Sequence, residues 1–432
     1  MKIFERRNLI VNLKENINER VYIKGWVHRI RKLKTISFII IKDRTGFVQC
    51  VVNSETIENL KLTLESVVEI EGIVKENANK LNNYEVEISS IKVINFAEEN
   101  LPIQVNKTDL NEQLDTILNN RVLSFRNEKE RAIFKIQNAL SASFTKYLRE
   151  NDFLEIHTPK IVKEGAEGGA NVFKLNYFGE DAFLAQSPQF YKQMMVIAGF
   201  ERVFEVGPVF RAESHSTNRH LNEYTSMDLE IGFVEDEYIL MALETELLNY
   251  MFKYVFENCK TEIKLLNINL PKIEGKIPRM KLSEAIALYN KNNNQSISGD
   301  LTPEAEKYIG EYILKTTGSE FLFLTHYPQS KRPMYTMPEG ELETRSFDLL
   351  FKGLEITTGG LRIHNLEQLK KQMGKKNLKI ENYEMYLEAF KIGAPPHGGL
   401  AIGLERLTKQ LIGFKNIRRT CLFPRDGQRL LP

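Results

Sequence analysis

The stretch that decides the fold reads GPVFRAESHSTNRHLNEY and spans residues 207–224. An apolar run ends at Arg211, a polar loop follows over residues 214–219, and a second run begins near Glu223. This pattern predicts two antiparallel strands joined by a cationic loop. Arginine suits the binding of a polyphosphate, because its planar guanidinium donates hydrogen bonds in pairs and keeps its charge. For the stretch alone, an exposed polar hairpin without a ligand is the simpler interpretation.

The surrounding residues 128–432 mix strands with helices. Apolar residues at helical spacing from Glu128 to Arg149 predict a long amphipathic helix. Further helices are expected over residues 189–198, 235–259, 303–317, 366–373 and 381–391. Strands are expected over residues 204–210, 226–233, 321–326, 346–350 and 354–357. Because these strands follow one another without regular helical crossovers, we predict an α+β domain with an antiparallel sheet flanked by helices.

Residues 1–100 are expected to form a separate domain. Apolar and polar residues alternate over residues 21–50, and two more strand-like runs lie within residues 67–88. About five short strands in this length predict a closed five-stranded β-barrel of the OB-fold type. Residues 101–127 are polar, so we expect a hinge or linker between this barrel and the domain of residues 128–432.

Composition excludes several classes of protein. The 432 residues are 42% hydrophobic and 27% charged, which is a globular balance rather than that of a disordered chain. No apolar run has the roughly 18 residues that a membrane helix needs, and residues 1–20 lack the apolar core of a secretory signal. Three scattered cysteines form neither a disulfide framework nor a zinc motif. We therefore expect a cytoplasmic protein with no membrane partner.

The formal net charge of +2 conceals an uneven distribution. Residues 1–50 hold twelve Lys and Arg against four Asp and Glu, a local excess of +8. A solvated charged surface is the simpler interpretation of such an excess. On a small barrel, however, a basic face is also the usual footprint of nucleic-acid binding.

Two further stretches carry residues suited to phosphate and metal chemistry. Residues 398–407 place three glycines before an apolar helix, which permits either a close approach to a ligand or a tight strand-to-helix junction. Asp348 and Glu355 lie in apolar runs, where a carboxylate needs a cation. Glu355 and Thr358 would supply oxygen ligands to Mg²⁺. The alternative is an ion pair between Glu355 and Arg362.

Taken in order, these stretches resemble the three motifs of the class II aminoacyl-tRNA synthetases. Phe210-Arg211-Ala212-Glu213 with His220 is similar to motif 2, and Gly403-Leu404-Glu405-Arg406 is similar to motif 3. The long helix before Thr158-Pro159 is similar to motif 1, the family's dimerisation element. With a barrel in front, the chain resembles subclass IIb, whose members act on aspartate, asparagine or lysine. The resemblance covers essentially the whole chain and implies ATP, a tRNA partner and a homodimer.

Two stretches are similar to the aspartyl members of that subclass, namely AQSPQFYKQ at residues 185–193 and GGLRIH at residues 359–364. An aspartate side chain is an anion, so its pocket needs cations, which Lys192 and Arg362 would supply. A pocket for asparagine should avoid two cations, and a pocket for lysine would need carboxylates. The chain lacks a large insertion before motif 3, and in this it resembles the compact archaeal and eukaryotic type.

The resemblance implies a reaction in two steps. Aspartate attacks the α-phosphate of ATP to give aspartyl-adenylate and pyrophosphate, and the aspartyl group then passes to the terminal adenosine of tRNA-Asp, with tRNA-Asn left open as a second acceptor. Catalytic roles are implied for Arg211, Glu213, His220 and Arg406. ATP would be bound by Arg211, Glu213, His220, Leu221, Tyr224, Glu355, Gly403 and Arg406. Aspartate would be bound by Glu167, Gln189, Lys192, Arg211, Thr358 and Arg362, and Mg²⁺ by Glu355 and Thr358.

The barrel is expected to read the tRNA anticodon. Related barrels stack an exposed aromatic side chain on a base and read base edges with polar groups. Arg31, Phe38 and Gln49 match the family's spacing, and either Glu85 or Glu87 would add a contact. A position in the core is the alternative for Phe38.

Three other functions stay open at this point. An asparagine–tRNA ligase would share the fold, and Lys192 and Arg362 argue against it. A catalytically inactive relative that serves as an RNA-binding or regulatory protein would not need Arg211 or Glu355. A tRNA-independent ligase on the same catalytic fold would lack the barrel of residues 1–100.

Overall fold

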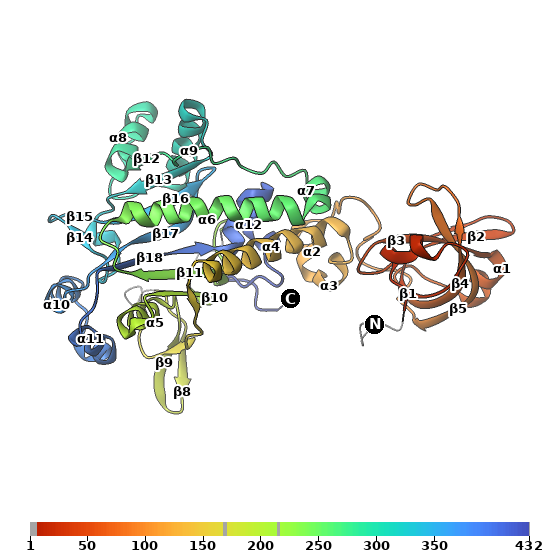
Figure 1. Ribbon diagram of the computed structural model, residues 1–432, viewed down its shortest axis with the longest axis horizontal. Helices are drawn as coiled ribbons and strands as arrows, with labels where there is room; N and C mark the ends of the chain where they lie inside the picture. Colours follow the sequence, from red (N-terminus) through yellow and green to blue (C-terminus); the bar gives the residue numbers. More distant parts are fainter. Residues whose placement is uncertain (1–6, 167–170, 214–216, 432) are drawn as a thin grey trace. The chain divides into compact units, whose positions relative to one another are not determined.

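The computed structural model describes residues 7–166, 171–213 and 217–431. The chain divides into two compact units, Met1–Glu112 and Gln113–Pro432, and each is described by itself (Figure 1). Residues 101–127 were expected to be a linker, and the structure differs in their second half. There the chain forms two short helices of the second unit, α2 (Leu114–Asn119) and α3 (Arg121–Ser124).

Arg121 explains why this segment joins the second unit. Its buried guanidinium lies 3.0 Å from Glu130 and donates hydrogen bonds to the backbone carbonyls of Arg419, Cys421 and Leu422. A buried cation needs partners of this kind, because it has lost its water. The three carbonyl partners lie near the other end of the chain, so no local pattern around Arg121 indicates them.

The first unit is the predicted closed five-stranded barrel. Its strands are β1 (Arg20–Lys32), β2 (Ile36–Lys42), β3 (Phe47–Asn53), β4 (Val67–Glu76) and β5 (Tyr84–Asn95), and they close in the order β1-β2-β3-β5-β4. Helix α1 (Ser54–Leu60) follows β3. Alternate strand residues such as Ile23, Ile39 and Val48 fill the interior, as the period of a strand requires.

The second unit is built on an eight-stranded sheet in the order β12-β13-β16-β17-β18-β11-β10-β6. These strands are β6 (Leu154–Glu155), β10 (Arg202–Phe210), β11 (Glu223–Gly232), β12 (Arg279–Lys281), β13 (Phe321–Thr325), β16 (Ser346–Phe351), β17 (Leu354–Arg362) and β18 (His397–Gly403). Every neighbouring pair is antiparallel except the outermost pair at each edge. The predicted α+β class is confirmed.

Helices cover this sheet and bury its core (Figure 1). The long helix α4 (Glu128–Glu150) packs beside α6 (Glu237–Asn258), and α12 (Leu404–Ile412) packs against α4. The remaining helices are α5 (Gln189–Met195), α7 (Lys260–Leu266), α8 (Leu282–Asn293), α9 (Pro303–Thr317), α10 (Leu366–Lys375) and α11 (Glu384–Lys391). Small strands complete the unit: β7 (Ile161–Val162), β8 (Lys174–Tyr177), β9 (Glu180–Leu184), β14 (Pro338–Glu339) and β15 (Glu343–Thr344).

The glycine-rich run at residues 398–403 forms strand β18 within the sheet, between β17 and β11. The sequence pattern predicted either a close approach to a ligand or a tight strand-to-helix junction, and the structure shows a seven-residue strand followed directly by a helix. Helix α12 then starts directly at Leu404. The buried carboxylate of Glu405 accepts a hydrogen bond from the Thr225 N–H at 3.0 Å, and this contact fixes the first turn of α12 on β11.

Within the described ranges, no helix is both long and apolar enough to cross a membrane.

Candidate active site

A pocket opens over the sheet where β10, β11, β17 and β18 meet the first turn of α12. All eight residues predicted to bind ATP line it: Arg211, Glu213, His220, Leu221, Tyr224, Glu355, Gly403 and Arg406. Three residues predicted to bind aspartate, Gln189, Thr358 and Arg362, line it as well. The sheet thus brings together residues from four distant stretches of sequence. Glu167 lies outside the described residues.

The hairpin of β10 and β11 carries five of the residues predicted to bind ATP. The guanidinium carbon of Arg211 lies 5.7 Å from the centre of the Tyr224 ring. The side-chain amide of Asn222 donates hydrogen bonds to the carbonyls of Arg211 at 2.8 Å and Glu213 at 3.2 Å, which fixes the returning chain. Burial lowers the pKa of His220 and outweighs the opposing charge of Glu213. The imidazole is therefore neutral at pH 7 in the free protein.

Glu355 stands opposite this hairpin on β17. The Thr358 hydroxyl donates a hydrogen bond to its carboxylate at 3.1 Å, and Arg406 Nη1 lies 3.5 Å from the same oxygen. Burial alone would raise the pKa of Glu355, but the charges of Arg406, Arg332 and Arg211 outweigh burial and lower it. The site therefore holds an ionised carboxylate among cations.

The alternative ion pair between Glu355 and Arg362 does not form, because Arg362 pairs with Glu230 at 2.9 Å. Asp348 is also paired: Arg332 Nη2 lies 2.6 Å from its carboxylate. Burial raises the pKa of Asp348 to about 6, with Arg332 opposing the effect. Glu355 and Thr358 fit the hard oxygen ligands of Mg²⁺, which commonly takes one or two carboxylates and completes its shell with phosphates and water.

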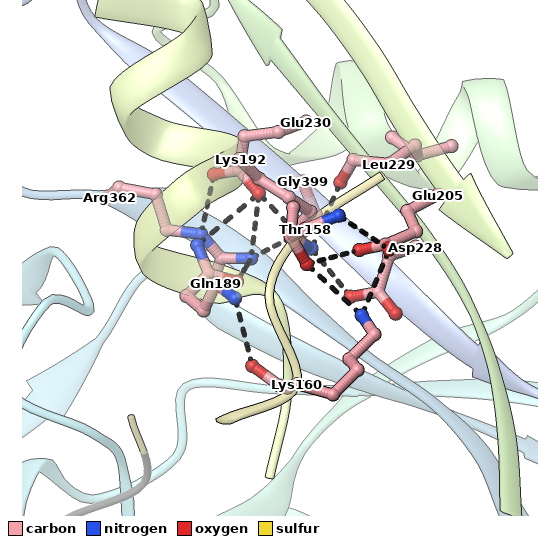
Figure 2. A network of polar contacts seen from close by, with 11 residues as sticks. Thr158, Lys160, Gln189, Lys192, Glu205, Asp228, Leu229, Glu230, Arg362 and Gly399 are labelled. Atoms are coloured by element: carbon pink, nitrogen blue, oxygen red, sulfur yellow. Dashed lines mark hydrogen bonds and ion pairs between the residues drawn. The ribbon is translucent and has the colours of Figure 1, made fainter. Parts of the chain in front are cut away.

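Figure 2 shows the polar network around Gln189, Lys192 and Arg362, three of the residues predicted to bind aspartate. Arg362 donates hydrogen bonds to Glu230 at 2.9 Å, to the Gly399 carbonyl at 3.1 Å and to the Gln189 side chain at 3.4 Å. Lys192 Nζ lies 2.8 Å from Asp228 and 3.5 Å from Glu230. Two cations thus share two carboxylates, and the set is formally neutral.

The network is almost completely buried, since the exposed side-chain fraction of Glu230 is 0% and that of Arg362 is 6%. Burial alone would raise the pKa of Glu230, but Arg362 and Lys192 outweigh it and hold the pKa below its usual value. Gly399 makes the arrangement possible. A Cβ at this position would lie 2.2 Å from the Glu230 carboxylate, so any larger residue would displace the network.

Lys192 differs from its expected place, because it is not among the residues that line the pocket. It comes from α5 and lies behind the lining, where it neutralises Asp228 and Glu230. Sequence reasoning missed both carboxylates, which follow one another at alternate positions of β11. Asp228 lines the pocket, and its second oxygen is buried without a hydrogen-bond partner in the described chain. That oxygen can accept a hydrogen bond from a ligand.

A second pair that sequence reasoning missed lies at the rim of the pocket. Arg219, at the end of the motif 2 loop, forms an ion pair with Glu306 of α9. Both residues line the pocket. The loop had been noted as polar and cationic, but nothing in the sequence links it to a helix that begins at residue 303.

On the barrel, Arg31, Phe38 and Gln49 share the outer face of three neighbouring strands. Phe38 pairs with Arg31 across β1 and β2, and it is half-buried while its neighbour Ile39 is fully buried. The core position considered for Phe38 is therefore wrong. Gln49 donates a hydrogen bond to the Glu85 carboxylate at 2.8 Å, which sets Glu85 beside this group.

The family follows from comparison with known sequences. A family model described as tRNA synthetases class II (D, K and N) matches residues 113–427. The chain belongs to this family. A second model, described as an OB-fold nucleic acid binding domain, matches residues 21–94 of the synthetase. The resemblance identified from the three motifs and the barrel is confirmed.

Relatives match the synthetase along almost its whole length. An Aspartate–tRNA(Asp/Asn) ligase of Thermus thermophilus is 45% identical over 427 residues, which cover 99% of this chain and 100% of the relative. An Aspartate–tRNA(Asp) ligase of Picrophilus torridus is 42% identical and covers 96% and 97%. The solved asparaginyl-tRNA synthetase from Pyrococcus horikoshii with asparaginyl-adenylate has a TM-score of 0.91 at 29% identity and covers 100% of both chains. The backbone alone therefore does not distinguish aspartate from asparagine.

Proposed function

We propose that this synthetase activates L-aspartate with ATP and transfers the aspartyl group to tRNA-Asp. Relatives that are 42% and 45% identical over nearly the whole chain are named aspartate–tRNA ligases, and the asparagine alternative is not favoured. The observation that carries the amino-acid assignment is Arg362, whose guanidinium stands in the pocket wall beside Gln189. A planar cation matches a carboxylate and gives the amide N–H groups of asparagine no acceptor.

Activation requires that two substrates are positioned and that charge is stabilised. In the proposed arrangement Arg211 binds the α-phosphate, at which the α-carboxylate of aspartate attacks. His220 and Arg406 contact the outer phosphates, and Arg406 also covers one face of the adenine. Tyr224 stacks on the other face. Glu213 accepts a hydrogen bond from the adenine amino group, and no covalent bond to the enzyme is needed.

The aspartate itself is held at its side-chain carboxylate and at its ammonium group. Arg362 binds the side-chain carboxylate, and Lys192 supports it from behind through the shared carboxylates. The substrate ammonium approaches the buried second oxygen of Asp228, with Gln189 and Glu167 completing its surroundings. The support for Asp228 is its place in the pocket lining and its unsatisfied oxygen.

Mg²⁺ is proposed to bind together with ATP, held by Glu355 and Thr358. When bound it would neutralise negative charge on the phosphates. The support is the pair of hard oxygen donors 3.1 Å apart in the pocket. The lowered pKa of Glu355 keeps its carboxylate ionised at neutral pH.

Recognition of tRNA is proposed to lie on the barrel, where Phe38 stacks on an anticodon base and Arg31, Gln49 and Glu85 read neighbouring groups. The support is their common outer face and the contact between Gln49 and Glu85. Charging of purified tRNA-Asp with labelled aspartate tests the function. We expect incorporation into tRNA-Asp, and its absence would refute the proposal. A parallel reaction with tRNA-Asn defines the acceptor range.

A homodimer formed through the motif 1 region is also proposed. Val122 on α3 and Phe256 on α6 leave 73% and 58% of their surfaces exposed, and α3 directly precedes the motif 1 helix α4. Large exposed apolar side chains commonly mark interfaces. Analytical ultracentrifugation is expected to give twice the 50.0 kDa mass of one chain.

A further inference from the structure

Helix α9 carries Glu306 to the rim of the pocket, where it meets the motif 2 loop. The carboxylate of Glu306 accepts a hydrogen bond from Arg219 Nη2 within an ion pair. Both side chains are largely buried, with exposed fractions of 14% for Glu306 and 21% for Arg219. An ion pair shielded to this degree is held more firmly than one on an open surface.

Glu306 holds the guanidinium of Arg219 and not the loop backbone. The adjacent residue Asn218 is fixed separately, because its carbonyl accepts a hydrogen bond from the Ile417 N–H at 3.0 Å. The Asn218 side chain also accepts a hydrogen bond from the amide of Asn416 at 3.0 Å. Removing the Glu306 carboxylate would therefore release the Arg219 side chain while its main chain stayed in place.

Helix α9 is a rigid base for Glu306, because its backbone touches the turn between β16 and β17. A Cβ on Gly310 would lie 2.6 Å from the Gly353 Cα, and a Cβ on Gly353 would lie 2.8 Å from the Lys307 Cα. Gly353 also has a φ of +71°, which favours glycine. This turn leads directly into β17, the strand that carries Glu355.

The charges around Glu306 couple it to the nucleotide side of the pocket. The pKa of Glu306 is raised to about 7, mainly by burial. The charges of Arg219 and Arg406 oppose this rise, whereas the charge of Glu355 adds to it. Lys409 of α12 belongs to the same set, since burial and the charges of Arg219 and Arg406 together lower its pKa to about 8. One carboxylate thus stands among cations that face the site proposed for the outer phosphates.

Arg219 also has an unused donor. Its Nε is buried and has no hydrogen-bond partner among the residues that the structure describes, while Nη2 is held by Glu306. A buried guanidinium donor without an acceptor is costly, and it points to an acceptor that a ligand brings.

We propose that Glu306 is a positioning residue for ATP: it holds the Arg219 guanidinium at the pocket so that the remaining donors of Arg219 meet an outer phosphate. This inference rests on the proposed function, because it takes ATP as the occupant of the pocket. Glu306 does not touch the reacting atoms. Its proposed role is to orient Arg219.

The test is the dissociation constant of ATP, measured by titration calorimetry on the full chain in the presence of MgCl₂. A charge-assisted hydrogen bond that orients one cation is worth about tenfold in affinity, so we expect Glu306→Gln to raise the constant by about tenfold. The constant for aspartate is expected to stay within about twofold. Glu311→Gln is the matched control, because Glu311 lies on the same helix and is 68% exposed. Glu306→Asp keeps the charge and is expected to lie between Glu306→Gln and the wild type.

Two further readouts separate positioning from a merely structural role. In an Arg219→Ala background, Glu306→Gln is expected to change the ATP constant no further, because the group it orients is gone. Lowering the pH from 8 to 6 protonates Glu306 and releases Arg219. ATP binding by the wild type is therefore expected to weaken more than ATP binding by Glu306→Gln. Protonation of ATP itself affects both proteins equally, so it does not contribute to this difference.

Three results would each overturn the proposal: unchanged or tighter ATP binding by Glu306→Gln, the same loss in Glu311→Gln, or an effect that persists in Arg219→Ala. ATP–pyrophosphate exchange by the wild type distinguishes this proposal from the proposed function. If the wild type exchanges with aspartate while Glu306→Gln binds ATP normally, only the role of Glu306 is overturned. If the wild type binds no ATP, both are overturned.

Discussion

Replacing Arg362 with methionine removes both an observed ion pair and a proposed contact with the substrate. The side chain neutralises the buried Glu230, and it is proposed to bind the carboxylate of aspartate. Methionine is flexible and of similar length, so it fills the space without a charge. Arg362→Met is therefore expected to abolish aspartate-dependent exchange and to destabilise the second unit.

The size of the destabilisation follows from the surroundings of Glu230. Its side chain is 0% exposed, and without Arg362 its nearest cation is Lys192 at 3.5 Å, which already serves Asp228 at 2.8 Å. Breaking a buried ion pair by removing one partner costs about 3–5 kcal/mol. Adding Glu230→Gln removes the stranded charge, so the double variant is expected to regain about half of this loss or more while exchange stays absent.

The loss also depends on pH in a defined direction. In the wild type the pKa of Glu230 is lowered, so its contribution to stability is present above the unfolded-state pKa and disappears as the pH falls through the folded-state pKa. Without Arg362, burial dominates and raises the pKa. The free energy of unfolding of the variant then falls by about 1.4 kcal/mol for each pH unit above the unfolded-state pKa, until the pH reaches the raised pKa. The difference in the free energy of unfolding between the wild type and Arg362→Met therefore widens from pH 5 to pH 8.

Urea unfolding at these two pH values measures the effect. Far-UV circular dichroism follows mainly the second unit, because the long helices α4, α6 and α9 all belong to it. Fluorescence of Trp26, the only tryptophan in the chain, follows the barrel and should not change. If Arg362→Met is as stable as the wild type at pH 8, or if adding Glu230→Gln restores no stability, Glu230 does not depend on Arg362 for its neutralisation.

Three other predictions concern different parts of the molecule. Phe38→Ala removes stacking worth about 1–3 kcal/mol per base, so the KM for tRNA should rise about tenfold or more while ATP–pyrophosphate exchange is unchanged; equal losses in both assays would contradict the anticodon role. Burial raises the pKa of Glu244 on α6 to about 8, although the Thr357 hydroxyl opposes the rise. The contribution of the protonated Glu244 to folding stability is therefore complete at low pH and declines as the pH rises above the unfolded-state pKa. Glu244→Gln should be more stable than the wild type in urea at pH 8, and the difference in stability should be smaller at pH 5. Glu355→Gln should raise the MgCl₂ concentration for half-maximal exchange by about tenfold, with aspartate binding measured by calorimetry unaffected; an unchanged requirement would remove Glu355 from the metal site.

The order of motifs was enough to predict the two folded units and most of the pocket. Apolar and acidic residues alternate over residues 227–231 of β11, and β10 pairs with β11 in antiparallel register, so two strand-like runs around a polar loop were enough to predict the hairpin. The glycine-rich run of β18 was harder to interpret. A strand in the middle of a sheet normally shows large apolar residues, but here Gly399 leaves the space that Glu230 occupies.

Pairings between distant elements were beyond the sequence. The sequence analysis singled out Lys192 and Arg362 for their charge. The carboxylates that neutralise them lie on β11, in a stretch that matched no motif for a binding-site acid. The same holds for Glu306, which belongs to an ordinary amphipathic helix until the fold brings it to Arg219. The residue types were visible in the sequence, whereas their partners depend on tertiary packing.

The pocket with Arg362 in its wall is proposed to select aspartate. ATP–pyrophosphate exchange by the purified wild type, with aspartate and asparagine supplied separately, tests it most directly. We predict exchange with aspartate and none above background with asparagine. Exchange with asparagine but not with aspartate would contradict the account.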